Sequence, residues 1–377
     1  MADMARYHSL DSRASSSSQN LTEHLRLVHQ VISSRYPDID RVALATYDAT
    51  TDGLSTFVSS NNDGIRLDHY CAKLSDVPSL QELARTRQSR TVDDLDSSFT
   101  STSQHTSWLK KREYRSSFTV PVFHGDALSG FLFFDSKKST AFDVETAGFL
   151  EVFSNLISQL YLLQLQVIQG MVGVVHVASD LARIRDLETG QHLERMAAYS
   201  RLMARELALA KDISDEFIEY LFLFAPLHDI GKVGIPDHVL LKPGKLNAEE
   251  WNVMRNHVEI GVTIVEQMGK DLKIGNSLAF NVMRNIVEAH HERGDGTGYP
   301  KGLTMADIPL EARIVAVADV YDALSNRRPY KEPWSAEDIR CELELEVSRG
   351  RLDADCVRVL LACEIQRAEI SLMHADR

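Results

Sequence analysis

The chain has 377 residues, a length that suggests two or three domains, and its 41 Lys and Arg against 54 Asp and Glu give a formal net charge of −13. Hydrophobic residues make up 44% and charged residues 25%, which excludes disorder over most of the chain. The acidic total argues against a nucleic-acid polymer as partner, although a local basic patch can still hold a small anion. The four cysteines form no CxxC pair, so a disulfide framework and a thiolate zinc site are not expected.

The N-terminus lacks the charged-then-apolar pattern of a signal peptide, and no run of 18 consecutive apolar residues occurs. We therefore expect a cytoplasmic protein without a membrane segment. Residues 1–20 contain four consecutive serines, Ser15 to Ser18, and are expected to form a disordered tail.

Residues 21–145 predict an α+β domain. Apolar residues recur at helical spacing over 21–36, and short β-rich runs follow. These runs lie at 42–47, 53–58, 117–123 and 128–134. A His-Gly-Asp turn separates the last two runs, which predicts a β-hairpin.

Residues 146–175 predict a long connecting helix, because apolar side chains step alternately by four and three positions. The apolar stripe comprises Phe149, Phe153, Leu156, Leu160, Leu163 and Val167. Two interpretations stay open from the sequence. The stripe packs on its own domain, or it forms a parallel homodimer helix that links a sensor to an output domain.

After about residue 170 the β signals stop, and helix-capping patterns predict an all-α domain over 176–377. Ser214 precedes an acidic first turn, and Asn247 with Glu250 resembles a capping box before a helix over 248–268.

The adjacent residues His228 and Asp229 follow the apolar run 220–224. An isolated His-Asp pair means little, but a charged pair after an apolar helix is costly to bury, and a metal ion would satisfy both groups. Lys232 lies three residues beyond Asp229 and could offer a phosphate group a positive charge.

The strongest local signal runs from His290 to Pro300. Paired histidines follow an apolar helical segment, and a turn with three glycines then brings the backbone close to them. A loop of this composition beside two imidazoles is typical of a binding site.

Three weaker signals gain weight only in combination. Glu188 and His192 would share one helix face, although such pairs more often lie on the surface. A lone helical histidine such as His257 is usually structural. Asp319 lies in an apolar stretch, where pairing with a buried arginine is the alternative.

Together, five imidazoles and three carboxylates without thiolates favour Fe, Mn or Zn. Eight ligands are too many for one ion and suit two or three ions that share a bridging carboxylate. Such a site activates water at neutral pH and holds the attacking and leaving oxygens of phosphoryl transfer.

This combination resembles the HD-GYP family, a branch of the HD-domain metal-dependent phosphohydrolases, over about residues 170–370. The resemblance rests on ETGxH at 188–192, HDIGK at 228–232, His257, HHExxDGxGYP at 290–300 and DxxDA followed by RPYK at 319–331. It implies a bacterial second-messenger phosphodiesterase that hydrolyses cyclic di-GMP to pGpG and onward to GMP.

The resemblance also implies roles for individual residues. The implied metal ligands are Glu188, His192, His228, Asp229, His257, His290, His291 and Asp319. Asp229, the implied bridge, and Lys232 are the expected catalytic residues. Because a glutamate at position 188 goes with a third metal in this family, a trinuclear iron or manganese site is expected.

The expected substrate-binding residues are Lys232, Asp295, Gly298, Tyr299, Pro300, Arg328 and Lys331. Asp295 is expected to order the loop that carries the GYP motif, and this loop is also expected to meet diguanylate cyclase domains.

The N-terminal domain resembles a GAF domain, most clearly at 118–134. GAF domains bind small ligands or mediate dimers, but Cys71 is isolated and no chromophore or haem motif is evident. The expected fold is thus a GAF-like α+β domain over 21–145, a connecting helix over 146–175 and an all-α HD-domain helical bundle over 176–377.

Three alternative functions remain open at this point. The chain could hydrolyse cyclic GMP-AMP, it could act as a catalytically weak receptor for a cyclic dinucleotide, or it could be a scaffold whose output is protein contact.

Overall fold

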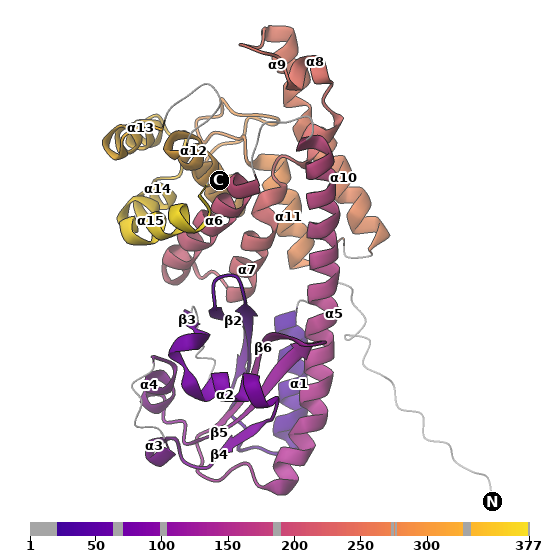
Figure 1. The fold of residues 1–377 in the computed structure, drawn as a ribbon, viewed down its shortest axis with the longest axis vertical. Coiled ribbons are helices and arrows are strands. Elements are labelled where there is room, and N and C mark those ends of the chain that lie inside the picture. Colours follow the sequence, from indigo (N-terminus) through magenta and orange to yellow (C-terminus); the bar gives the residue numbers. More distant parts are fainter. Residues whose placement is uncertain are drawn as a thin grey trace, which may run out of the picture.

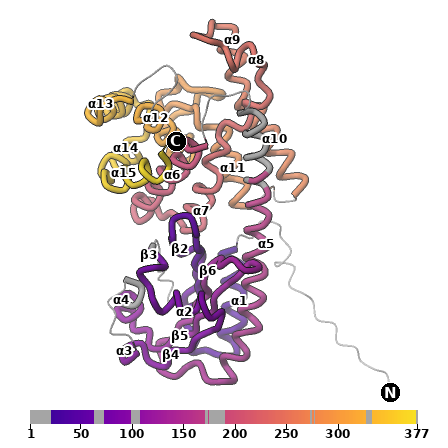
Figure 2. Tube along the Cα trace, in the orientation of Figure 1, coloured from indigo at the N-terminus to yellow at the C-terminus, as the bar shows by residue number. Residues whose placement is uncertain are grey.

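The computed structural model describes residues 21–62, 71–98, 104–183, 190–272, 275, 277–326 and 333–375. The chain forms two units stacked along one long axis, and the long helix α5 (Val144–Arg183) runs beside both (Figures 1 and 2). The N-terminal unit combines a sheet with helices and the C-terminal unit is helical, which confirms the predicted fold class. The predicted disordered tail lies outside the described residues.

The N-terminal unit contains one antiparallel sheet in the strand order β3-β2-β1-β6-β5-β4. Its strands are β1 (Arg41–Asp48), β2 (Gly53–Asn61), β3 (Cys71–Lys73), β4 (Arg90–Val92), β5 (Ser116–His124) and β6 (Ala127–Ser136). Strands β5 and β6 form the predicted hairpin.

Alternation along β6 builds two cores, because successive side chains of a strand point to opposite faces. Leu132 and Phe134 face the core shared with α1 (Leu21–Arg35) and α5, whereas Phe131 and Phe133 face α2 (Pro78–Thr86). The short helices α3 (Leu95–Ser98) and α4 (Gln104–Lys111) lie at the end of the sheet near β4 (Figure 1).

The apolar stripe of α5 has two environments. Phe149 packs on Tyr36 with ring centroids 5.0 Å apart, so the first part of the stripe belongs to its own domain. Leu156, Leu160 and Leu163 are 49%, 38% and 60% exposed. The dimer interpretation of this exposed part stays a prediction.

The C-terminal unit follows the predicted helical pattern. Its helices are α6 (Gly190–Lys211), α7 (Asp215–Phe224), α8 (Asp237–Leu240), α9 (Ala248–Arg255), α10 (His257–Asp271), α11 (Leu278–Ala289), α12 (Leu310–Ser325), α13 (Ala336–Ser348), α14 (Ala354–Ala362) and α15 (Glu364–Met373). Ser214 caps α7, and Asn247 with Glu250 forms a complete capping box at α9.

The single helix predicted over 248–268 is wrong, because the chain breaks at Asn256 into α9 and α10. The break lets the start of α10 pack against the short 3-10 turn η4 (Ile230–Gly234). At the contact, a Cβ on Gly231 would lie 1.8 Å from the carbonyl oxygen of His257, so only glycine permits this approach.

Helix α7 connects the two units through buried carboxylates. Glu216 accepts hydrogen bonds from the backbone of Leu21 and from the hydroxyl of Thr22, at 3.3 and 2.7 Å. Glu219 accepts one from Ser55 on β2, at 3.0 Å. The helix that leads to His228 is therefore fixed directly to the N-terminal sheet.

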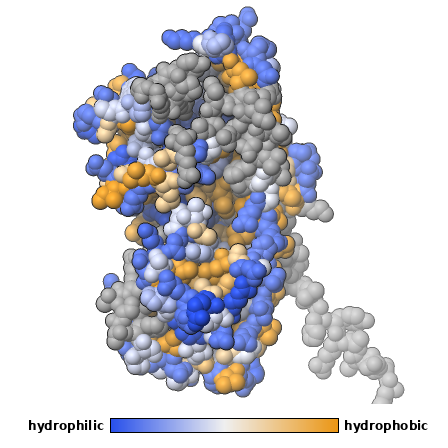
Figure 3. Space-filling view, viewed as in Figure 1, coloured by the Kyte–Doolittle hydropathy of each residue, from blue (hydrophilic) through white to orange (hydrophobic). Residues whose placement is uncertain are grey.

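Apolar surface gathers around the waist between the two units (Figure 3). Among the described helices, none combines the length and the apolar composition that crossing a bilayer requires.

Removing one partner of a buried ion pair between neighbouring strands should destabilise the sheet. Arg41 and Asp135 are 2% and 0% exposed and pair across β1 and β6. Asp135→Ala leaves a buried guanidinium without its carboxylate, so we expect the free energy of unfolding to fall by about 3–5 kcal/mol. Denaturant unfolding followed by circular dichroism measures this change.

The matched control is Asp126→Ala, which removes the exposed partner of Arg87, at 2.9 Å. We expect a change below about 1 kcal/mol there. Equal effects of the two substitutions would contradict the assignment.

Candidate metal centre

The structure brings seven of the eight predicted metal ligands together in two groups. Within each group, one nitrogen or oxygen atom per residue lies within 4.8 Å of the others. The first group is Asp229, His257, His290 and His291, and the second group is His192, His228 and Asp319. Glu188, the eighth predicted ligand, lies outside the described residues.

The local fold positions each side chain. Helix α7 ends at Phe224, ahead of Pro226, and the 3-10 turn η3 (Ala225–Leu227) follows, so His228 and Asp229 lie between two tight turns, not on a continuous helix. The other ligands lie near the start of α6, at the start of α10, just after α11 and on α12.

The Asp229 carboxylate lies between the two groups. Its Oδ2 atom is 3.1 Å from Nε2 of His228 in the second group. Its Oδ1 atom is 3.1 Å from Nε2 of His257 and 3.7 Å from Nε2 of His290, both in the first group. Each carboxylate oxygen therefore faces a different group.

Backbone hydrogen bonds fix the tautomers of three imidazoles. The Nδ1 atoms of His228, His257 and His290 each donate to a carbonyl oxygen, because a carbonyl cannot donate. The acceptors are Ala225, Met254 and Ile286, at 3.0, 2.8 and 3.0 Å. Each Nε2 atom of a neutral ring therefore presents its lone pair to the interior of the site.

These lone pairs test whether the site fits a metal ion. Within the described part of the chain, Nε2 of His257, Nε2 of His290 and Oδ1 of Asp229 are buried and have no hydrogen-bond partner. Acceptors that face one another at 3.1 Å repel unless a cation lies among them. The donor set, imidazole nitrogen and carboxylate oxygen, suits a divalent metal ion.

Electrostatics favour the same protonation states. Burial tends to raise the pKa of Asp229, but the positive charge of Lys232 opposes this effect, and that pKa lies well below its usual range. The Nζ atom of Lys232 lies 3.0 Å from Oδ2 of Asp229. Burial lowers the pKa of both His290 and His291, so these rings are neutral at pH 7.

A buried network supports the second group, and the sequence analysis missed it. Nδ1 of His192 lies 2.7 Å from Oδ2 of Asp322, and Arg195 donates to both oxygens of that carboxylate, at 2.7 and 3.1 Å. The pairing with a buried arginine that was considered for Asp319 belongs to Asp322, one helical turn further on. A carboxylate behind a histidine fixes the ring and strengthens it as a ligand.

The GYP motif packs against the first group. The ring of Tyr299 stacks on His291 with centroids 4.7 Å apart, and the guanidinium of Arg255 lies 5.1 Å from the Tyr299 centroid. A Cβ on Gly298 would lie 2.2 Å from the backbone nitrogen of Arg293, so glycine is required there.

Two carboxylates hold this loop. Buried Glu292, which the sequence analysis did not single out, accepts from the backbone of Lys301 and Leu303, at 2.7 and 2.8 Å. Asp295 accepts from Thr297 and from Arg351. The two remaining predicted cations, Arg328 and Lys331, lie outside the described residues.

Comparison with known proteins agrees with this geometry. A family model of the HD domain matches residues 177–355, and a model of the GAF domain matches residues 20–160. The chain therefore contains a GAF domain followed by an HD domain. The two groups described above lie within the matched HD region and form its candidate metal site.

Three relatives carry more specific names. A probable cyclic di-GMP phosphodiesterase of Vibrio cholerae is 49% identical over 207 residues, which cover 54% of this chain and 46% of the relative. A 3′3′-cGAMP-specific phosphodiesterase 2 of the same organism is 42% identical, over 47% of this chain and 32% of the relative. The cyclic di-GMP phosphodiesterase response regulator RpfG of Xanthomonas campestris is 45% identical, over 49% and 46%. The chain thus spans less than half the length of each of these relatives.

Asp322→Asn should weaken metal binding without unfolding the domain. The amide retains the shape of the carboxylate but loses the charge that orients His192, so we expect the affinity for Mn²⁺ to fall about 10–100-fold. Isothermal titration calorimetry measures it. Asp307→Asn, at an exposed position that pairs with Thr304, is the control and should leave the affinity unchanged. An unaltered affinity in Asp322→Asn would refute the supporting role.

We expect Asp295, which holds the loop that carries the GYP motif, to have an unusually low pKa. Hydrogen bonds from Thr297, and then Arg351, lower the pKa of Asp295 from 3.8 to about 2. Because the pKa is lower in the folded state, the carboxylate stabilises the loop above about pH 4, and this contribution is lost as the pH falls towards 2. We expect Thr297→Val to raise the pKa towards 3.8, measured by carbon-detected NMR. A pKa near 3.8 in the wild type would contradict this account.

Proposed function

We propose that this chain is a metal-dependent phosphodiesterase that hydrolyses cyclic di-GMP to pGpG and onward to GMP, under the control of its GAF domain. The observation that carries the proposal is the Asp229 carboxylate between two groups of imidazole lone pairs, with the ammonium of Lys232 beside it. The names of the relatives from V. cholerae and X. campestris support the substrate.

Two divalent ions would be shared between the groups, with Asp229 as the bridge. His257, His290 and His291 would hold one ion, and His192, His228 and Asp319 the other. We propose iron or manganese, and a third ion at Glu188. Such ions lower the pKa of bound water and neutralise charge on phosphoryl oxygens.

The residues of the chain position the substrate around this centre. Lys232 donates to the phosphoryl oxygen on which negative charge develops, and its contact with Asp229 holds the ammonium in place beforehand. Arg328 and Lys331 bind the second phosphate. Tyr299, fixed by His291, shapes the wall of the substrate pocket with Gly298 and Pro300, and Asp295 keeps this loop ordered.

A second candidate substrate is 3′3′-cyclic GMP-AMP, because one relative at 42% identity is specific for it. The two dinucleotides differ in one base only, and both present the same phosphates to Lys232. A panel assay with each dinucleotide at equal concentration distinguishes them by kcat/KM.

Partners are proposed from two surfaces. The exposed side chains Leu156, Leu160 and Leu163 of α5 would pair with a second copy of the chain to form a homodimer. The loop that carries Tyr299 would contact diguanylate cyclase domains.

The double variant His228→Ala/Asp229→Ala should abolish hydrolysis, because it removes the bridge and one ligand of the second group. We expect no pGpG or GMP above background when products are separated by chromatography under anaerobic, iron-loaded conditions. Asp307→Asn serves as the control with normal turnover. Retained turnover in a sample of verified metal content would refute the site, and tight binding without any product from the wild-type chain would favour a receptor.

A further inference from the structure

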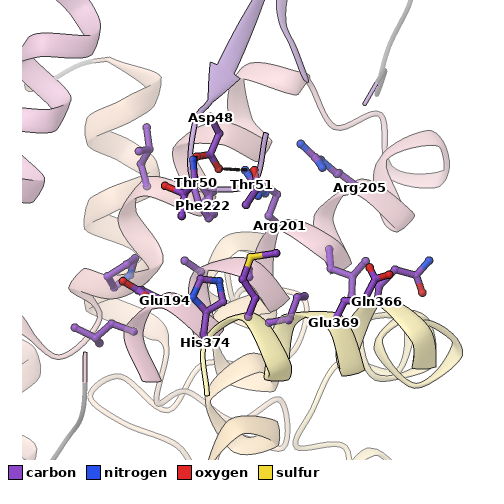
Figure 4. A pocket seen from close by; sticks show the side chains of 18 of the residues that line it. Asp48, Thr50, Thr51, Glu194, Arg201, Arg205, Phe222, Gln366, Glu369 and His374 are labelled. Carbon is purple, nitrogen blue, oxygen red and sulfur yellow. Dashed lines mark hydrogen bonds and ion pairs between the residues drawn. The ribbon is translucent and has the colours of Figure 1, made fainter. Parts of the chain in front are cut away.

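A cavity of about 600 Å³ lies between the two domains, and none of the seven described candidate metal ligands is among the residues that line it. Figure 4 shows the tip of the β1–β2 hairpin, with Asp48, Thr50 and Thr51, pointing into it from the GAF domain. The HD domain supplies the other walls from α6, the end of α7 and α15. A neighbouring cavity of about 400 Å³ shares part of this lining.

The interior of the cavity is mainly apolar. Phe222 and Pro226 line it from the α7 side, Ala198 from α6, and Ile370 and Met373 from α15. The small side chain of Ala198 leaves open space where a larger residue would fill it. A pocket of this volume and composition at a domain interface is typical of a small-molecule site.

The charged side chains around the cavity are balanced by charges of opposite sign. The Arg201 guanidinium lies 3.9 Å from carboxylate oxygens of both Asp48 and Glu219, and 3.8 Å from the Phe222 ring centroid. Arg205 contacts Glu219 at 3.2 Å.

On the opposite wall, His374 contacts Glu194 at 2.8 Å. Exposed Glu369 adds a further negative charge at the rim. The lining therefore carries no excess of positive charge that would attract an anion.

We propose that this interdomain cavity binds an uncharged, mainly apolar small molecule. Apolar contact supplies the affinity, and the hydroxyl groups of Thr50 and Thr51 on the hairpin offer hydrogen bonds to one polar group of the ligand. The ligand contacts both domains at once, so it binds only when the hairpin faces α6.

The cavity is coupled to the metal centre through α6, and this part of the inference rests on the proposed function. One face of the helix lines the cavity with Glu194 and Arg201, and another face carries His192 and Arg195. Arg195 donates to the backbone oxygen of His374, a cavity residue, at 2.9 Å.

Arg195 also holds Asp322, which fixes His192. A ligand that shifts α15 or α6 therefore changes the orientation of a metal ligand. Coupling is reciprocal for binding, so the small molecule and the metal ion change each other's affinity by the same factor.

Binding is tested on the full chain without metal, with N-phenyl-1-naphthylamine as a neutral fluorescent probe and its anionic 8-sulfonate as the matched comparison. We expect saturable binding of the neutral probe and at least tenfold weaker binding of the sulfonate. Ala198→Phe fills the cavity and should weaken the neutral probe at least tenfold, whereas Ala210→Phe, on the exposed end of the same helix, should not.

A second pair of variants tests whether a loss of probe binding in Ala198→Phe reflects misfolding. Met373→Lys places a charge in the cavity, and Leu372→Lys places it on the adjacent position, which is 80% exposed and outside the lining. Only the first should weaken binding. The absence of saturable binding, equal effects within either pair, or a sulfonate that binds as well as the neutral probe would overturn the proposal.

Coupling is tested by calorimetric titration of Mn²⁺ with and without saturating neutral probe, and needs no turnover. We expect the Kd for Mn²⁺ to change at least threefold in the wild type and to stay constant in Ala198→Phe. A constant Kd in the wild type would overturn the coupling, while the proposed hydrolysis is judged separately by its products.

Discussion

The HD domain depends on one electrostatic constraint. Lone pairs of carboxylate oxygens and imidazole nitrogens face one another in its interior, with no proton between them. The oxygens of Asp229 face imidazole nitrogens at 3.1 Å on both sides, and the opposite nitrogens of those rings already donate to the backbone. Such an arrangement is unfavourable in an empty site and favourable around cations. The packing of the helices therefore holds these groups together at a cost in the free energy of folding, and this preorganises the candidate metal centre.

The surrounding helices serve this constraint in different ways. Gly231 allows two backbones to touch, so that His257 at the start of α10 reaches Asp229 on the turn after α7. Asp322 contacts the His192 ring and Arg195 holds Asp322 in place, and Arg195 and Asp322 are each 2% exposed. Because α7 also contacts the GAF sheet, that sheet is connected directly to the turn that carries His228 and Asp229.

The sequence predicted much of this, because motif spacing and helical periodicity report local chemistry. The histidines, Asp229 and Asp319 stand out as polar residues in or after apolar segments. The break at Asn256 and the role of Asp322 were not predictable in this way. Both depend on contacts between residues far apart in the chain, such as the one between Asp322 and Arg195, 127 positions apart. Glu219 likewise has the pattern of a solvated helix face until the GAF domain packs on it.

The central claim is that Asp229 bridges two metal ions. Anomalous X-ray diffraction from crystals of the full chain grown with Mn²⁺ tests it most directly. The account predicts a strong anomalous peak on each side of the Asp229 carboxylate, with His257 and His290 at one peak and His192 and His228 at the other, in addition to any peak from the third ion proposed at Glu188. A single peak, or peaks that Asp229 does not contact, would contradict it.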